Sequence, residues 1–363
     1  MYDVIIIGGG ASGLSAGIIA KERGKSVLIL ESANRVGKKL LATGNGKCNL
    51  ANMNICNQNY NNPYVAHFID KTQKFYDFWQ KLGLKIKQVE DRIYPYSDSA
   101  TTVLNLLRGN FLPSEIKTGF NVESIQKKDG IFLINDTILA KNVILATGSN
   151  ATLGQNSHHL AQNFGHKVTE LRPSIAPLLT DTTFIKNLAN LRAKVKVSLV
   201  CGDKIVAKQM GEILFKSNGI SGICIFMLSS YIARNQGEYK VLVDFAPDLS
   251  LSQVQEFLQK HSIFGLFQKP ICQSIIKQAE NTGHDLATTV KNFVIENAML
   301  GPVKFAQVVH GGLDTNEFDT TLQSKLVSNF YACGEVLNVD GDCGGYNLFW
   351  AFISGITAGE NVC

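Results

Sequence analysis

The sequence contains no cysteine pair or cysteine–histidine cluster with the spacing of a metal site. None of the eight cysteines forms a C-x-x-C pair, so we expect no zinc centre and no other metal. Basic residues form no long stripe, and the formal net charge is only +5, so we expect no nucleic-acid partner. The longest apolar run, 219–233, is shorter than the roughly 18–20 residues of a membrane span, which argues against a membrane protein.

We also expect no secretory leader, because a strand pattern begins at Tyr2 with no basic segment before it. We therefore expect a cytoplasmic protein with reduced thiols. The 363 residues exceed the roughly 250–300 at which a single core stops growing. With 45% hydrophobic residues, the chain can fill the cores of two or three folding units.

The first 31 residues have the pattern of a complete βαβ unit. Tyr2–Ile7 is a buried-strand run, Ala11–Arg23 has helical spacing, and Ser26–Leu30 is a second strand that ends in Glu31. The intervening loop has glycine at positions one, three and six of G-x-G-x-x-G. This pattern predicts a dinucleotide whose diphosphate lies at the helix N-terminus.

The three glycines of this loop have separate roles. Gly8 permits the turn, Gly10 lets the backbone approach the diphosphate, and Gly13 lets the helix pack closely on the strand. Glu31 follows Gly13 by 18 positions, near the ~20 expected of an acid that binds the ribose hydroxyls. A non-binding glycine turn is the alternative, and the combination of strand, loop, helix and acid argues against it.

The rest of the chain alternates between strand and helix patterns. Near the N-terminal unit we expect a loop over 37–52, a helix over 63–82 with Phe68, Phe75, Phe78 and Trp79 inside, an antiparallel meander over 116–138, and a strand over 142–146. Further along we expect a hairpin over 194–208, a strand over 239–245, helices over 252–261, 270–280 and 286–298, a strand over 329–333 and a closing helix over 347–359.

Three later features favour FAD over NAD. The 142–146 strand ends in Ala146-Thr147-Gly148, whose small residues let the backbone approach a cofactor. A second strand ends in Gly334-Glu335, and an acid there can bind a ribityl chain, which only a flavin has. Gly345-Tyr346-Asn347 opens a helix whose N-terminus can face the flavin edge that gathers negative charge on reduction.

Two long loops resemble those of the bacterial BaiN/YhiN flavoproteins, which are described as aminoacetone-oxidase-like or NAD(P)/FAD-dependent oxidoreductases. Residues 37–49, G-K-K-L-L-A-T-G-N-G-K-C-N, are similar to one family signature, and residues 334–348 are similar to another. Asn338 departs from the family pattern, which usually has Asp there.

The resemblance and the motifs together imply a set of FAD-binding residues. Those expected at the ADP half are Gly8, Gly10, Ala11, Ser12, Gly13, Glu31, Ser32, Lys39 near the diphosphate, and Val122 at the adenine. Those expected at the ribityl chain and flavin ring are Gly44, Asn45, Gly46, Asn49, Ala146, Thr147, Gly148, Gly334, Glu335, Gly345, Tyr346, Asn347 and Leu348.

No residue stands out as an obligatory base, and Cys48 and His310 are the two catalytic candidates. Cys48 lies in the loop expected beside the flavin; it is either a redox-active thiol or a small packing residue. The lack of a nearby resolving cysteine favours packing. His310, before two glycines, is either a proton shuttle or a structural histidine.

The predicted fold is α/β: a Rossmann-like FAD-binding domain (parallel sheet plus β-meander) over 1–173 and 306–363, with an inserted β-rich domain over 174–250 and a small helical subdomain over 251–305. The predicted function is FAD-dependent oxidoreduction, with hydride transfer between a small organic substrate or NAD(P)H and the flavin N5. No second G-x-G-x-x-G loop follows residue 150, so NAD(P)H would bind only transiently. The alternatives are a regulatory protein that binds FAD with little turnover and an RNA-modifying flavoenzyme.

Overall fold

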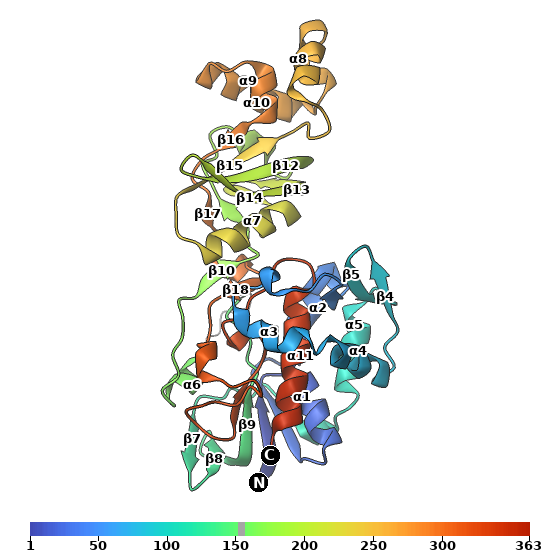
Figure 1. Ribbon diagram of the computed structural model, residues 1–363, viewed down its shortest axis with the longest axis vertical. Helices are drawn as coiled ribbons and strands as arrows, with labels where there is room; N and C mark the ends of the chain where they lie inside the picture. Colours follow the sequence, from blue (N-terminus) through green and yellow to red (C-terminus); the bar gives the residue numbers. More distant parts are fainter. Residues whose placement is uncertain (152–156) are drawn as a thin grey trace. The chain divides into compact units, whose positions relative to one another are not determined.

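The computed structural model describes residues 1–151 and 157–363. The chain forms two compact units. Unit 1 comprises Met1–Leu171 and Val308–Cys363, and unit 2 comprises Arg172–Gln307. In Figure 1 the first and last parts of the chain, blue and red, interleave within unit 1.

Unit 1 is built on a seven-stranded sheet in the order β6-β2-β1-β9-β8-β7, with β19 also paired to β9. Strands β6, β2, β1, β9 and β19 run parallel. Val4, Ile5 and Ile6 of β1 are completely buried, because parallel sheets of this kind are covered on both faces. The strands are β1 (Tyr2–Ile7), β2 (Val27–Glu31), β6 (Ile116–Thr118), β7 (Ile125–Lys128), β8 (Ile131–Ile134), β9 (Ile138–Leu145) and β19 (Phe330–Ala332).

The meander prediction needs one correction. β6 pairs in parallel with β2 at the far edge of the sheet, so it is not part of the meander over 116–138. Strand β9 starts antiparallel to β8 and continues in parallel with β1 and β19. The end of the predicted meander and the predicted strand over 142–146 therefore belong to one strand. The sequence pattern separated them because the polar pair Lys141-Asn142 interrupts the apolar run.

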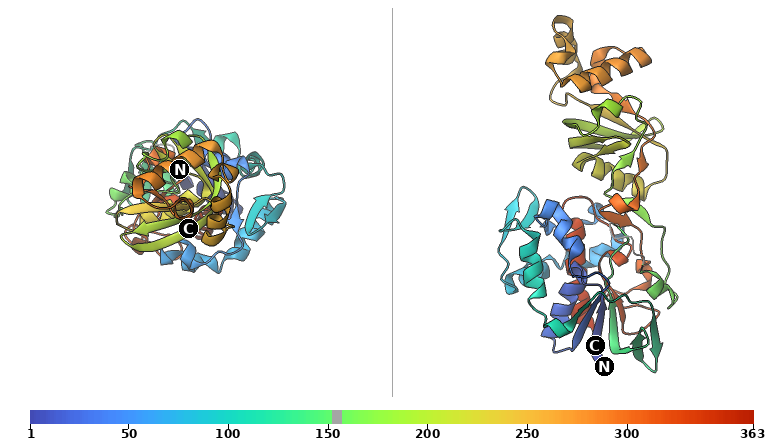
Figure 2. Two further views of the ribbon diagram at one scale, coloured as in Figure 1. Left: turned by 90° about the horizontal axis from the view of Figure 1, so that it is seen from above. Right: turned by 180° about the vertical axis from the view of Figure 1, so that it is seen from behind.

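Two helices that are far apart in sequence pack against each other in unit 1, as both side views show (Figures 1 and 2): α1 (Ala11–Glu22) and α11 (Tyr346–Asn361). The approach is so close that a side chain at Gly355 would overlap the Ser12 carbonyl oxygen, and one at Gly359 would overlap the Ala16 carbonyl oxygen. Glycines one turn apart thus let the last helix pack directly on the backbone of the first.

The loop expected over 37–52 contains regular structure. Helix α2 (Lys38–Ala42), a 3-10 turn (Thr43–Gly46) and β3 (Ala51–Asn52) lie within it. Five helical residues are too few to show periodicity, which is why the pattern missed α2.

The helix expected over 63–82 is broken into a 3-10 turn (Pro63–Val65), α3 (Ala66–Ile69) and α4 (Thr72–Lys81). Its predicted apolar face is nevertheless buried throughout. The other elements of unit 1 are β4 (Ile86–Val89), β5 (Arg92–Pro95), α5 (Ala100–Arg108), α6 (His159–Gln162) and β18 (Val308–His310).

Unit 2 contains a seven-stranded sheet in the order β16-β15-β12-β13-β14-β11-β17. The predicted hairpin is present as β12 and β13, joined at Cys201-Gly202-Asp203-Lys204. The strands are β10 (Arg172–Ser174), which lies outside this sheet, β11 (Leu178–Leu179), β12 (Arg192–Cys201), β13 (Lys204–Lys216), β14 (Gly219–Ser221), β15 (Tyr239–Asp244), β16 (Phe293–Ile295) and β17 (Met299–Leu300).

The helices of unit 2 are α7 (Ile223–Arg234), α8 (Leu251–Lys260), α9 (Lys269–Thr282) and α10 (Leu286–Lys291). The helix expected over 286–298 is wrong in its second half, because α10 ends at Lys291 and the β-branched run that follows forms β16, paired with β15. One hydrophobic core includes side chains of both the sheet and the helices. The division of this insert into a β-rich domain and a helical subdomain remains a prediction.

Candidate functional site

The glycine-rich loop has the geometry that its sequence requires. Gly8 has a φ of +109°, and side chains at Gly8 or Gly13 would overlap the Ala146 or Gly8 carbonyl oxygens. At Gly10, by contrast, an added Cβ would meet no atom within 4 Å. Gly10 caps α1 with no side-chain hydrogen bond and no acid in the first turn. The amide groups at this end of α1 are therefore free of competing side chains and favour an anion.

Glu31, at the end of β2, is held beside this loop. Its Oε2 accepts a hydrogen bond from Gly9 N at 2.8 Å, and its Oε1 accepts one from Ala33 N at 2.7 Å. Oε1 also accepts a longer hydrogen bond from Ser32 Oγ at 3.4 Å, so Oε2 is the oxygen that keeps a further acceptor site. The side chain is therefore oriented and still able to bind a ribose hydroxyl. Ser32, the next residue, is exposed.

The second predicted loop, at Gly334, meets the first. A Cβ on Gly334, whose φ is +76°, would lie 2.5 Å from Ser12 Oγ. Two side chains of helix α11 hold this turn in place: Gly334 N donates to Ser354 Oγ at 2.9 Å, and Trp350 Nε1 donates to Gly334 O at 3.0 Å. Residues more than 300 positions apart in sequence therefore form one surface.

Glu335 follows this turn and forms an ion pair with Lys39. Its Oε1 also accepts hydrogen bonds from Ser149 Oγ at 2.8 Å and Val309 N at 3.0 Å. Two predicted cofactor ligands thus contact each other directly. Ser149 is a member of this group that sequence reasoning missed, although it directly follows Ala146-Thr147-Gly148.

The loop over 43–49 and the start of α11 are also brought together. Gly44 and Asn45 both have left-handed backbone conformations, and a Cβ on Gly345 would lie 2.9 Å from Asn49 Oδ1. Among the residues that the structure describes, Asn49 Oδ1 and Thr147 Oγ1 are buried with no hydrogen-bond partner. Unpaired buried polar atoms are costly, so two of them along the predicted cofactor path point to a ligand.

The remaining predicted contacts vary in how free they are to bind a cofactor. Within the described parts of the chain, no protein group bonds to the buried Val122 backbone. Gly345 caps α11 without a side-chain hydrogen bond. The amide of Asn347 instead binds the Gly341 backbone, with Oδ1 accepting and Nδ2 donating at 2.8 Å each. Tyr346 is buried.

Leu348 packs partly buried against the core of unit 1, and Gly46 and Gly148 have positive φ angles of +84° and +69°. The donors, acceptors and glycines of the two loops suit an ADP moiety at α1 and a polar, hydrogen-bonding ring system at α11. FAD has both parts, so these residues fit it.

Cys48 is completely buried. Burial raises the pKa of its thiol to about 12, so the reactive thiolate is scarce near neutral pH. Its φ of +60° is unusual for a residue with a side chain. The packing interpretation fits these facts better than a redox-active thiol.

His310 lies in a hydrogen-bonded group that sequence reasoning missed. Its Nδ1 is 2.8 Å from Asp340 Oδ1, and Asn61 and Asn338 complete the group. Asn338 and Asp340 belong to the family-like signature, whereas nothing in the sequence pointed to Asn61.

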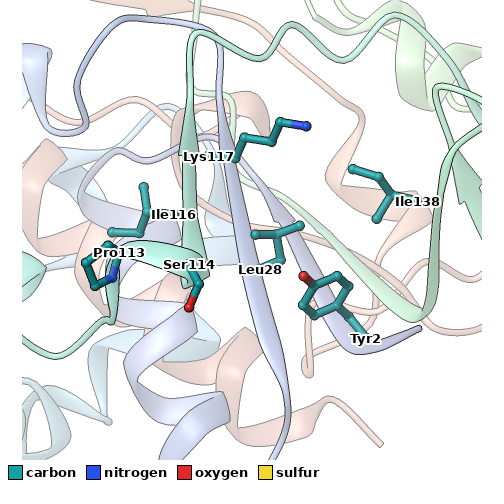
Figure 3. Close-up of a pocket in the computed structure, with 7 residues that line it drawn as sticks. All are labelled: Tyr2, Leu28, Pro113, Ser114, Ile116, Lys117 and Ile138. Atoms are coloured by element: carbon teal, nitrogen blue, oxygen red, sulfur yellow. The ribbon is translucent and has the colours of Figure 1, made fainter.

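A surface pocket elsewhere in unit 1 does not coincide with this site (Figure 3). Tyr2, Leu28, Ile116 and Ile138 line it, with Lys117 and a Pro113-Ser114 turn. Tyr2, Leu28, Ile116 and Ile138 lie at or near the amino ends of their strands, whereas ligands of parallel α/β sheets bind beyond the carboxyl ends. Within the described residues, 1–151 and 157–363, no group of three or more side chains could hold a metal ion. No helix in these ranges is long and apolar enough to cross a membrane.

Comparison with known proteins assigns the chain to a family. The model of the HI0933-like protein Rossmann domain matches residues 2–361. A 3-dehydro-bile acid delta(4,6)-reductase of Clostridium scindens is 33% identical over 99% of this chain and 98% of its own length. A ribosomal RNA dihydrouridine synthase of Haemophilus influenzae is 26% identical, with 96% of each chain covered.

The chain belongs to the HI0933-like Rossmann family. Its fold is shared with 3-ketosteroid-delta4-(5alpha)-dehydrogenase from Rhodococcus jostii RHA1, with a TM-score of 0.55 and 13% identity over 99% of this chain and 96% of that one. The predicted α/β flavoprotein fold and the resemblance are confirmed. As a member of this family the chain is an FAD-binding oxidoreductase. The expectation of no nucleic-acid partner stays a prediction, since one relative is named for a ribosomal RNA reaction.

Proposed function

We propose that this protein is an FAD-dependent reductase of carbon–carbon double bonds conjugated to a carbonyl group in a small organic substrate. The supporting observation is the 33% identity, over 99% of the chain, to a reductase of 3-dehydro-bile acids. The name of that relative describes double bonds at positions 4 and 6, in conjugation with a carbonyl at position 3.

The second relative supports the same bond chemistry. A dihydrouridine synthase reduces the carbon–carbon double bond of uracil, which is also conjugated to a carbonyl. Two relatives with different substrates thus share one type of reacting bond. Reduction of such a bond adds a hydride at the carbon β to the carbonyl and a proton at the α carbon.

In this proposal each group of site residues binds or orients one part of FAD. When bound, FAD supplies the hydride chemistry. The amide groups at the start of α1 bind the diphosphate, and Glu31 binds the ribose. Glu335, held by Lys39 and Ser149, orients the ribityl chain, and the start of α11 stabilises negative charge on the ring.

A reduced nicotinamide is the proposed electron donor. It would bind transiently at the substrate position and leave before the acceptor enters. One competing function is that of a regulatory protein that binds FAD and turns over little. The other is that of an enzyme that reduces uridine in RNA.

Anaerobic mixing tests these alternatives. The purified protein is first reduced with NADPH or NADH and then mixed with a 3-oxo-Δ4 steroid, 2-methylcyclohex-2-enone, a uridine-containing ribosomal RNA fragment, or the saturated ketone as control. We expect the enones to restore the yellow flavin absorption far faster than the saturated ketone does. Reoxidation by RNA alone would identify the uridine reaction, and a flavin that neither donor nor acceptor changes would identify a binding protein.

A further inference from the structure

Four polar side chains from three separate segments form a group that we call the histidine cluster: Asn61, His310, Asn338 and Asp340. His310 Nδ1 lies 2.8 Å from Asp340 Oδ1. The Asp340 side chain is 1% exposed and the His310 side chain 22% exposed. The acid is therefore buried beneath the ring, and the ring reaches the surface of the unit.

The hydrogen bonds determine which ring nitrogen is free. Asn61 Oδ1 accepts from Asp340 N at 2.8 Å, so its Nδ2 must point to Asn338 Oδ1, 2.7 Å away. That amide is satisfied by Asn338 and lies a longer 3.4 Å from His310 Nδ1. The carboxylate of Asp340 is the stronger partner, and it therefore holds a proton on Nδ1. In the described residues no group bonds to His310 Nε2.

The histidine cluster is tied to both ends of the predicted flavin site. On one side, Val309 N, adjacent to His310, donates to Glu335 at 3.0 Å. On the other, Gly341, adjacent to Asp340, is bound on both its N–H and C=O by Asn347 in the first turn of α11. The cluster thus lies on the backbone that joins Glu335, the predicted ribityl-binding residue, to the start of α11, which would face the flavin ring.

A second histidine–acid pair in the same unit differs from His310 and Asp340 in the partners of its ring nitrogens. His166 Nδ1 lies 2.9 Å from Glu317, its Nε2 lies 2.9 Å from Ser324 Oγ, and its ring stacks on Phe318. Its side chain is fully buried. Both nitrogens of His166 are committed to the core, whereas His310 has one nitrogen committed and one available for proton transfer.

We propose that His310, oriented by Asp340, donates from Nε2 the proton that completes reduction of the substrate double bond. This role rests on the proposed function. The C=C π bond breaks, and the β carbon gains a hydride whose two electrons come from the reduced nicotinamide through the cofactor. The α carbon gains the Nε2 proton of the doubly protonated His310 ring, which leaves the ring neutral with its remaining proton on Nδ1 beside Asp340. His310 then regains a proton from water. Asp340 and Asn61 are positioning residues, because they act through the ring.

The test compares His310→Gln and Asp340→Asn with His67→Gln, a change at an exposed histidine outside the cluster. Each FAD-loaded variant is reduced anaerobically and mixed in D₂O with the enone that reoxidises the wild-type protein fastest. Reduction by NAD(P)H is timed separately in all four proteins, so that the rate of reoxidation by the enone is compared from the same fully reduced state. Reoxidation should slow by roughly 10²- to 10⁴-fold in His310→Gln, the usual contribution of a general acid, and by less in Asp340→Asn.

Two readouts separate proton delivery from a merely structural role. In the wild-type product the α carbon should carry deuterium on one face only, and in His310→Gln on both. In ¹⁵N NMR of histidine-labelled protein, without any substrate, neutral His310 should carry its proton on Nδ1, and Asp340→Asn should shift the proton towards Nε2.

The outcomes have different meanings for the two proposals. If enones reoxidise the wild-type protein and His310→Gln equally fast, with deuterium on the same single face, the role of His310 is overturned and the reductase function stands. A neutral tautomer with the proton on Nε2 in the wild-type protein also overturns it. If no enone reoxidises the wild-type protein, the reductase function fails, and proton delivery to such a substrate fails with it.

Discussion

The strongest test of the site's architecture is removal of one hydroxyl from the last helix. Ser354 is completely buried, and its Oγ accepts the only hydrogen bond that the described residues provide for Gly334 N. Ser354→Ala leaves that N–H buried and unpaired, which costs about 1–3 kcal/mol. Alanine is the better helix former by about 0.5 kcal/mol. The expected net loss of unfolding free energy is therefore roughly 0.5–2.5 kcal/mol.

Thr357→Val is the matched control for this change. Thr357 is also buried in α11, one turn further on, but its hydroxyl donates only to Ile353 O, which already accepts a helical hydrogen bond. Its removal leaves no unpaired group, so we expect a smaller loss of unfolding free energy than in Ser354→Ala.

Urea unfolding followed by tryptophan fluorescence measures both variants. The only two tryptophans, Trp79 and Trp350, lie in unit 1, so the signal reports on that unit alone. We also expect Ser354→Ala to release FAD more readily, since Gly334 positions Glu335. A Ser354→Ala protein as stable as Thr357→Val, with unchanged FAD retention, would refute the reasoning.

Three further predictions concern the cofactor loops. Because its pKa is raised to about 12, the Cys48 thiol should resist iodoacetamide at pH 7.5 while the exposed Cys56 reacts, as mass spectrometry would show; equal labelling would contradict this. Gly13→Ala should lose about 1–3 kcal/mol in urea unfolding through steric overlap, whereas Gly10→Ala, with open space around it, should keep its stability and lose FAD affinity about 10-fold (about 1.4 kcal/mol) by fluorescence titration. Glu31→Ala should raise the Kd for FAD roughly 10- to 100-fold, as expected for hydrogen bonds to a charged group, and an unchanged Kd would exclude Glu31 from the site.

Local patterns predicted the elements that carry long apolar runs. Strand β1 and helix α1 have nearly the expected bounds, because an apolar strand, a glycine turn and an apolar helix that ends before Gly24 each leave a clear signal over 5–12 residues. The failures are short or composite elements. Helix α2 has only five residues, and the run after Lys291 changes from helix to strand because β16 gains hydrogen bonds from β15, a partner that a local pattern cannot reveal.

The sequence predicted those residues of the candidate site that the backbone conformation requires to be glycine. It did not predict the contacts between side chains from distant segments. Gly8, Gly13 and Gly334 are identifiable because close approach excludes any side chain. The contact of Asp340 with His310 and the position of Asn61 depend on three segments separated by up to 279 residues. No spacing rule connects them, so only the folded chain reveals the histidine cluster.

Helix α11 determines the relation between the two halves of the site. Gly355 and Gly359 bring it onto the backbone of α1, Ser354 and Trp350 hold the Gly334 turn, and Asn347 holds the segment that carries Asp340. The glycine-rich loop, Glu335 and the histidine cluster thus all take their positions from one buried helix. Its interior side chains need not contact cofactor or substrate to control both, because a shift of the helix axis would move all three groups together.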